Sequence, residues 1–179
     1  SPLGTLYIEH EQQGTATCYY RELDIGRALA TVRYDRAGVT FTREYFVSHP
    51  DRIMIIRLSS SKREALNFTV KYKSLLRYTT SAEDKVLHVH GYAPYYAYPS
   101  YMGQVPEAIR FDEHKGTRFS VDMKVKNKGG HVTLSDSTIS VSGANEVVLY
   151  LSVATSFNGF DKDPVTDGQD SRALAARQL

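Results

Sequence analysis

The sequence predicts an all-β fold, an antiparallel β-sandwich that ends in a short helix. Segments with alternating apolar and polar residues recur at roughly ten-residue spacing, which is typical of sandwiches and barrels. Many of these segments are rich in β-branched and aromatic residues, which favour strands. A length of 179 residues corresponds to one domain. We therefore expect a sandwich domain over residues 1–156, and over 157–179 a loop and the start of a helical linker.

The first half of the chain contains a predicted hairpin and two further strands. The hairpin turns at residues 35–38 and closes on Gly38. Pro50 ends the hairpin's second strand, because proline has no N–H to donate to a sheet. The last strand of this half, residues 66–72, places its apolar side chains on one face. The expected strands are, in order, 28–34, 39–48, 52–59 and 66–72.

The second half continues with short strands and ends in a helix. Apolar and polar residues alternate over 117–125, which predicts a strand with one buried face. Residues 146–154 have apolar side chains on both faces of the strand, which predicts that both faces are buried. Residues 170–179 favour a helix capped by Asp170 or Ser171. The expected strands are 86–90, 109–111, 117–125, 131–134, 138–141 and 146–154.

Composition excludes several classes of partner. The chain has 22 Lys and Arg against 20 Asp and Glu, a formal charge of +2. This balance gives no reason to expect binding to nucleic acid or to a membrane surface. No apolar run approaches the ~18–20 residues of a membrane span. Cys18 is the only cysteine, so neither an intrachain disulfide nor a cysteine-based zinc site is expected, and no cofactor is indicated.

The segment 91–101 is the most unusual in the chain, with five tyrosines and two prolines. Proline stiffens a loop, and a tyrosine ring offers sugars a flat apolar face beside a polar hydroxyl. One interpretation is therefore an aromatic wall beside a carbohydrate or another protein. The alternative is a long loop that packs its own tyrosines over a sheet or a neighbouring domain.

Other candidate residues do not form a recognisable catalytic pattern. His88 and His90 share one face of a strand and could hold a metal ion, but no motif supplies a third ligand, so no metal is expected. Asp161, Asp163 and Asn158 could serve acid–base chemistry or calcium, but their spacing does not match an EF-hand and such residues are ordinary in loops. Nucleophile, phosphate-loop and dinucleotide motifs are missing from the sequence, so we predict no catalytic residue.

Several stretches taken in order resemble one family. They include YYRELD at 19–24, GVTFTREYFVSHPD at 38–51, HGYAP at 90–94 and ATSFNGFDKDP at 154–164. Together they resemble the N-terminal β-sandwich of glycoside hydrolase family 95, the inverting α-L-fucosidases and α-L-galactosidases. The resemblance implies a supersandwich-like fold that lacks its first strands. It also implies a helical barrel after the sandwich, which carries the catalytic acid and base, so this fragment alone is expected to be inactive.

The resemblance also implies a role for the HGYAP stretch, which is similar to a G-x-A-P stretch of the family. We take His90, Gly91, Tyr92, Tyr95 and Tyr96 as candidates for the rim of a glycan site. The implied partners are the barrel of the same parent chain and a glycan substrate. The parent is expected to be an exported bacterial protein, periplasmic or extracellular. Open sheet edges would in addition permit dimerisation.

Two other functions remain open at this point. The chain could be an independent carbohydrate-binding module that uses the tyrosine-rich loop, although it has no tryptophan, a frequent sugar platform. It could instead be a structural or interaction sandwich without a ligand. Binding of fucosylated glycans to the isolated chain would favour the module, and a helical barrel encoded downstream would favour the hydrolase domain over the plain sandwich.

Overall fold

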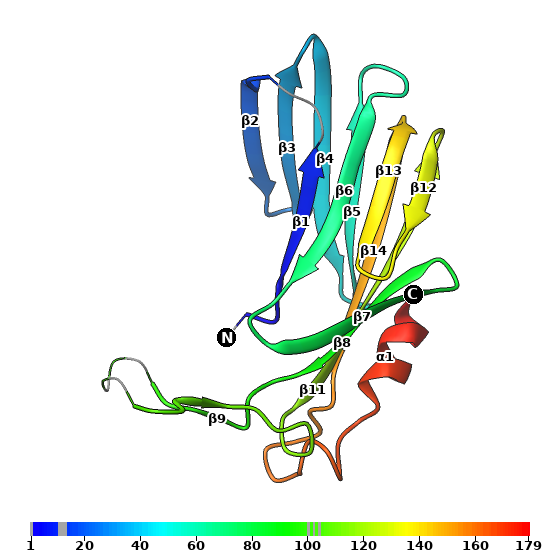
Figure 1. The fold of residues 1–179 in the computed structure, drawn as a ribbon. Helices are drawn as coiled ribbons and strands as arrows, with labels where there is room; N and C mark the ends of the chain where they lie inside the picture. Colours follow the sequence, from blue (N-terminus) through cyan, green and yellow to red (C-terminus); the bar gives the residue numbers. More distant parts are fainter. Residues whose placement is uncertain (1, 11–13, 100, 102, 104) are drawn as a thin grey trace.

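The computed structural model describes residues 2–10, 14–99, 101, 103 and 105–179. Two antiparallel sheets pack face to face, which confirms the predicted sandwich (Figure 1). The larger sheet has eight strands in the order β2-β3-β4-β5-β14-β11-β8-β7, and the smaller has four in the order β1-β6-β13-β12. A separate two-stranded ribbon, β9 with β10, extends away from the sandwich.

Most elements follow one another along the chain with short connections, and the two longest connections follow β9 and β14. Their bounds are β1 Thr5–His10, β2 Thr17–Asp24, β3 Leu29–Arg36, β4 Val39–Ser48, β5 Ile53–Ser60, β6 Leu66–Lys73, β7 Arg77–Glu83, β8 Val86–Tyr92, β9 Tyr96–Ala97, β10 Ile109–Arg110, β11 Arg118–Lys128, β12 His131–Leu134, β13 Thr138–Ala144, β14 Glu146–Thr155 and α1 Ser171–Gln178. α1 is far too short to cross a membrane, and no other helix in the described ranges is long and apolar enough to do so.

The core lies between the two sheets and is filled by the inward side chains of alternating strands. Phe68 and Val70 of β6 face Phe41 and Leu149 of the larger sheet, and all four are at most 2% exposed. Full burial of such a side chain contributes about 1.5–3 kcal/mol. The two-residue period of β6 thus determines which face of the small sheet is apolar, as its sequence predicts.

Every strand expected from the sequence is present, but four further strands were not predicted. These are β1, β2, β7 and β9. β2 shows no alternation of buried and exposed residues, because nearly all of it is exposed on both faces. β7 alternates mainly among polar residues, so its pattern carries little hydrophobic signal.

The expectation for residues 146–154 needs a correction. The side of β14 that faces away from the core is half-buried at Glu146, Val148 and Tyr150, and it is fully buried only at its end. β11 instead is buried on both sides from Phe119 to Met123. The reason is tertiary, since α1 packs on the outer face of the larger sheet over β11 and β14.

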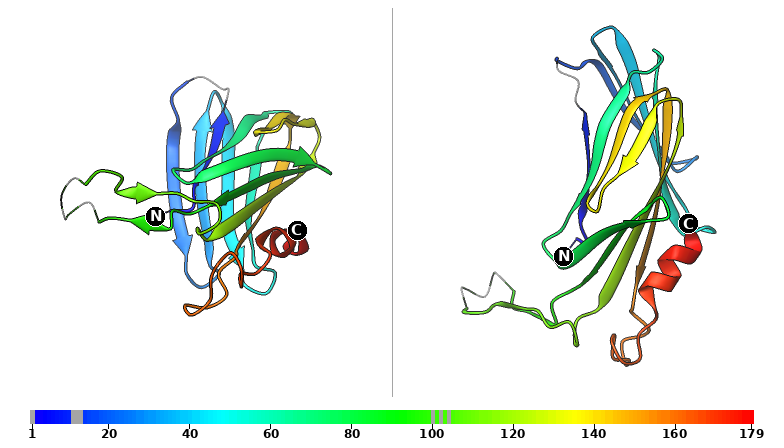
Figure 2. Two further views of the ribbon diagram at one scale, coloured as in Figure 1. Left: turned by 60° about the horizontal axis from the view of Figure 1, so that its bottom comes forward. Right: turned by 45° about the vertical axis from the view of Figure 1, so that its right-hand side comes forward.

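One end of the sandwich carries all of the long connections. The β9–β10 ribbon, the loop over 157–169 and α1 lie together at this end (Figure 2). The N–H of Ala93, at the base of the ribbon, donates to the carbonyl of Thr117 at 2.9 Å, and the N–H of Ser156 donates to the carbonyl of Arg118 at 2.9 Å. Hydrogen bonds to the start of β11 therefore hold both the ribbon and the loop over 157–169.

Candidate functional site

A cavity of about 420 Å³ lies at this end of the molecule, beside α1. Its walls come from β7, β8, β11, the turn that precedes β11 and the first turn of α1. Three arginines line it, together with a single carboxylate, Glu113, among the lining residues. The lining residues are Arg77, Tyr78, Thr79, His90, Gly91, Tyr92, Glu113, Arg118, Phe119, Ser120, Ser171 and Arg172.

The structure brings three of the five sequence-predicted rim residues to this cavity. His90, Gly91 and Tyr92 are consecutive at the end of β8 and all line it. Tyr95 and Tyr96 do not, because they lie on the ribbon that leaves the sandwich. They are 45% and 44% exposed, with Lys115 Nζ 5.1 Å from the Tyr95 ring and the Arg110 guanidinium 5.3 Å from the Tyr96 ring.

Tyr92 is placed between two arginines by the sheet register. It pairs with Arg77 of β7 on one side and with Arg118 of β11 on the other. Its ring meets Phe111 edge-on at 6.2 Å, and the Arg77 guanidinium lies 5.3 Å from the same Phe111 ring. This half-buried phenol beside two cations could hydrogen-bond to hydroxyl or acidic oxygens of a ligand.

Gly91 has a packing reason for being glycine. A Cβ atom built there would lie 2.3 Å from the carbonyl oxygen of Arg77 and 2.5 Å from the Phe119 ring. β8, which lies between β7 and β11, can therefore approach its neighbours closely only because this residue has no side chain. Gly91 shapes the cavity through the backbone and offers no functional group of its own.

His90 belongs to a buried polar network under α1. Its Nδ1 lies 3.2 Å from Ser120 Oγ, which lies 3.0 Å from Ser171 Oγ on the helix. Burial lowers the pKa of His90, and the nearby Arg172 lowers it further, against an opposing effect of Asp122. The imidazole is thus kept neutral at pH 7 and can both donate and accept.

The neighbouring histidine has a different partner. His88 Nδ1 lies 2.8 Å from Oδ1 of Asp122, a carboxylate that is 1% exposed. The two imidazoles stack at 5.8 Å, but each is bonded to a different partner, His88 to Asp122 and His90 to Ser120. The network therefore does not chain a hydroxyl, an imidazole and a carboxylate into a nucleophilic triad, and its geometry serves to fix α1 on the sheet.

The acidic loop after β14 is held together by its own hydrogen bonds. Oδ1 of Asp163 accepts from the N–H groups of Val165 and Thr166, each at 2.8 Å, and these bonds lower the pKa of Asp163. Asn158 donates to the carbonyl of Asp167 at 2.9 Å. Within the described residues, no group of three or more His, Cys, Asp or Glu side chains could hold a metal ion.

The sequence does not predict the three arginines of this cavity, and it indicates Ser171 only as a candidate helix cap. Arg77, Arg118 and Arg172 stand far apart in ordinary polar stretches, and no spacing links them. Only the pairing of β7, β8 and β11, with α1 docked over β11 and β14, brings the three together.

Fold and site together define a β-sandwich domain with a cationic, aromatic cavity at the end that carries its connecting segments. The family described as "Glycosyl hydrolase family 65, N-terminal domain" matches this chain over residues 1–159. The chain belongs to this family of N-terminal glycoside hydrolase domains. The resemblance to the N-terminal sandwich of α-L-fucosidase-like hydrolases, drawn above from the sequence, is thereby confirmed.

Two individual proteins are similar to the chain. "Alpha-L-fucosidase 2" of Arabidopsis thaliana is 30% identical over 185 residues, an alignment that covers 98% of this chain. The chain spans about a fifth of that relative, 22% of its length. A solved structure, "Putative kojibiose phosphorylase from human microbiome", aligns with a TM-score of 0.49 and 10% identity, over 97% of this chain and 26% of the other.

Proposed function

We propose that this chain is the non-catalytic N-terminal domain of an exported glycoside hydrolase that removes α-L-fucose or α-L-galactose from glycans. In this proposal the domain packs against a helical barrel that carries the catalytic acid and base. Family membership and the similarity to a plant α-L-fucosidase support the class of parent protein.

The observation that carries the packing role is the exposure of apolar side chains at one end. On the ribbon, Ile109 is 60% and Tyr101 86% exposed, and on the loop Phe160 is 99% exposed. Large apolar side chains gathered at one end of a domain mark an interaction site. Because the ribbon and the loop share that end with α1, a single partner domain could cover all three (Figure 2).

The packing role is tested by comparing the parent protein with the isolated chain. Ile109→Asp and Phe160→Asp should each lower the melting temperature of the parent, because a charge would replace an apolar side chain in the interface. The isolated chain should keep its melting temperature, since neither side chain is buried there. Val47→Asp, which changes an exposed residue on β4, is the matched control. A parent that tolerates both changes would contradict the interface.

The rim role is tested by kinetics of the parent. His90→Ala and Tyr92→Ala should raise KM or lower kcat for an α-L-fucoside, because both side chains line the cavity. His131→Ala, at the start of β12, is the control for loss of an imidazole. Unchanged kinetics for both cavity variants would contradict the rim role but leave the packing role intact.

The exposed tyrosines of the ribbon favour one alternative, an independent carbohydrate-binding module. Titration of the isolated chain with fucosylated oligosaccharides decides between the two. Chemical-shift changes at Tyr95 and Tyr96 would support the module, whereas unchanged spectra would support an accessory domain.

We further propose that the isolated chain dimerises through an open sheet edge. β2 and β7 end the larger sheet, and β12 ends the smaller one opposite β1. Exposed strand edges are ready templates for pairing. Light scattering should therefore give twice the mass of the chain, and a strict monomer would contradict this part.

A further inference from the structure

The cavity beside α1 has an excess of positive charge that its own lining does not neutralise. Arg77, Arg118 and Arg172 line it against a single carboxylate, that of Glu113. Among the residues that the structure describes, none of the three guanidiniums forms an ion pair. The Glu113 carboxylate instead lies 3.5 Å from Nε2 of His114. An anion that enters the cavity therefore meets cations that are not already paired.

The floor of the cavity consists of two rows of side chains on one face of the larger sheet. Arg77, Tyr92 and Arg118 are direct partners across β7, β8 and β11, so their side chains share this face. With neighbouring strands about 4.8 Å apart, the backbones of the two arginines lie roughly 10 Å apart, and the phenol stands between them. The next row on the same face is polar and consists of Thr79, His90 and Ser120.

A single turn orients the first row. The Arg77 guanidinium lies 5.3 Å from the Phe111 ring, and the Tyr92 ring meets that same ring edge-on at 6.2 Å. Arg118 Nη2 donates to the carbonyl oxygen of Glu113 at 3.1 Å. Phe111 and Glu113 both belong to the connection before β11, so this connection positions both guanidiniums and the phenol. Groups that are positioned in advance lose little conformational entropy when a ligand binds.

Groups that can bind hydroxyls lie beside the cations. His90 uses Nδ1 for its contact with Ser120, and within the described chain its Nε2 has no hydrogen-bond partner. The hydroxyl of Tyr92 likewise has none among the described residues. A neutral imidazole and a phenol can each donate and accept, which suits the hydroxyls of a sugar ring. The cavity thus offers cations and uncharged hydrogen-bonding groups together.

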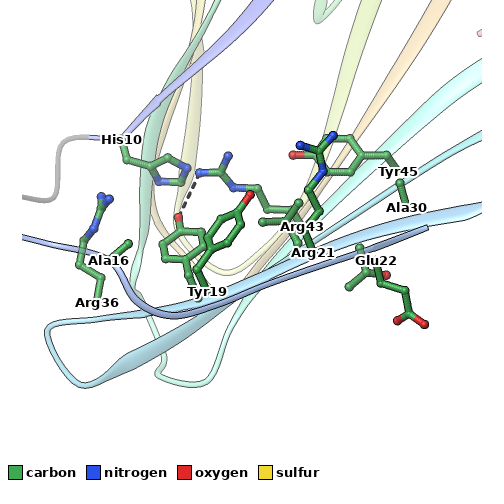
Figure 3. A pocket seen from close by; sticks show the side chains of 12 residues that line it. His10, Ala16, Tyr19, Arg21, Glu22, Ala30, Arg36, Arg43 and Tyr45 are labelled. Atoms are coloured by element: carbon green, nitrogen blue, oxygen red, sulfur yellow. Dashed lines mark hydrogen bonds between the residues drawn. The ribbon is translucent and has the colours of Figure 1, made fainter. Parts of the chain in front are cut away.

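The larger cavity of the chain, about 720 Å³ over β2, β3 and β4, shows a different use of arginine (Figure 3). Arg21 and Arg43 flank Val32 there, since both pair with it. Arg43 Nη2 donates to the hydroxyl of the buried Tyr34 at 3.0 Å, and its guanidinium lies 5.4 Å from that ring. Burial and the neighbouring arginines lower the pKa of His10, which also lines this cavity, to about 4. In this cavity the phenol is already bonded to its arginine, whereas the hydroxyl of Tyr92 is not.

We propose that the cavity beside α1 binds a uronic acid unit of the glycan, so that the parent hydrolase prefers acidic glycans. The sugar carboxylate would lie between Arg77 and Arg118, whose guanidiniums can bind it with paired hydrogen bonds. The hydroxyls of the same sugar ring would bond to Tyr92 and His90. A volume of about 420 Å³ lies within the range of small-ligand sites, about 300–1,000 Å³. This inference rests on the proposed function, because it assigns a substrate class to the same rim cavity.

An acidic side chain of the barrel is the main alternative occupant, since the proposed packing surface lies at the same end of the domain. Such a side chain would pair with the arginines but would bring no hydroxyls to Tyr92 and His90. A saccharide acid uses both sets of groups. Ligand sites are also common where two domains meet, so packing of the barrel at this end is compatible with a sugar in the cavity.

Binding is tested with the ¹⁵N-labelled chain and three probes: trigalacturonate, its neutral counterpart galactotriose, and a triglutamate peptide. Trigalacturonate should shift the amide signals of residues 90–92 and bind at least roughly tenfold more tightly than either of the other probes. Arg77→Gln and Arg118→Gln should each weaken trigalacturonate several-fold. Both residues are exposed, so their replacement leaves the fold intact. Arg33→Gln, which removes an exposed arginine 5.8 Å from the Tyr20 ring, is the matched control and should leave binding unchanged.

Kinetics of the parent protein test the preference itself. An α-L-fucosylated oligosaccharide that contains a uronic acid should have a lower KM than its neutral counterpart, and Arg118→Gln should remove most of this difference. Equal KM values for the two substrates would overturn the proposal. The melting temperature of each variant, measured alongside, shows whether the fold is kept.

Several binding results would also overturn the proposal. These are equal binding of trigalacturonate and galactotriose, no binding at concentrations on the order of 10 mM, or equal weakening by Arg33→Gln. Triglutamate that binds as tightly as trigalacturonate would show that the arginines accept an acidic side chain instead. If the inference fails while the parent hydrolyses neutral α-L-fucosides, the proposed function stands. A parent without glycosidase activity would contradict the proposed function, whereas the binding data would still decide what the cavity holds.

Discussion

His88 Nδ1 and Oδ1 of Asp122 lie 2.8 Å apart across neighbouring strands, and the carboxylate is almost completely buried. The pair lines a cavity together with Arg172 and Ala173 of α1, a helix that packs over β11 and β14. A buried carboxylate persists only with a good partner, because burying an unpaired charge is costly. The pair therefore ties β8 to β11 beside α1, whereas α1 itself is held by the bonds from Ser120 and Ser152 and by the buried Ala175.

Replacing Asp122 should destabilise the chain. Asp122→Ala leaves the inner nitrogen of His88 without a partner and is expected to cost about 1–3 kcal/mol. Asp122→Asn should cost less, because its amide oxygen can still accept the hydrogen bond. Urea unfolding followed by circular dichroism measures the difference. Asp136→Ala, at an exposed turn, is the control, and equal midpoints for it and Asp122→Ala would contradict the structural role.

Gly91 should not tolerate a side chain. A Cβ atom would meet the Arg77 carbonyl oxygen at 2.3 Å, so Gly91→Ala must push two strands apart, at a cost of about 1–3 kcal/mol. At Gly26 the nearest atom to such a Cβ is a flexible carboxylate oxygen 3.4 Å away, so Gly26→Ala is the matched control. Thermal unfolding compares the two variants. Indistinguishable melting temperatures would show that β8 adjusts freely.

The first turn of α1 should depend on its cap. Oδ1 of Asp170 accepts from the N–H groups of Arg172 and Ala173 at 3.0 and 3.1 Å. Asp170→Ala should lower the local stability of the helix by about 1 kcal/mol, whereas Asp170→Ser should retain most of it. Amide hydrogen exchange in α1 reports this directly. Asp167→Ala is the control, and faster exchange in that variant alone would refute the cap.

Acidification should destabilise the chain through two histidines. The folded-state pKa of His10 is about 4 and that of His90 is also lowered, both below the ~6.5 of an unfolded histidine. Folding therefore favours the neutral form of each imidazole. Their stabilising contribution is present above pH ~6.5 and is lost progressively as the pH falls toward 4. Unfolding free energies measured across this window should fall less steeply for His10→Gln. A slope unchanged by that substitution would contradict the assignment.

Sequence alternation predicted most of the fold because burial in a strand follows a two-residue period. Residues 66–72 illustrate this, with every apolar side chain on the core face. Alternation gives no signal where that period is hidden, as in β2, which has both faces exposed. Alternation also could not predict that α1 buries the polar side of β11, because Ser120 and Asp122 are residue types that normally face solvent.

The amino-acid sequence by itself determined the strands with hydrophobic alternation, the position of the helix and its Asp170 cap, and the family through ordered stretches such as ATSFNGFDKDP. These are local properties, set by side chains within a few residues of one another. The order of strands in the sheets decided the rest. It placed Tyr92 between Arg77 and Arg118, and it set Arg21 and Arg43 on either side of Val32. Such sites join residues that are remote along the chain, so only packing could create them.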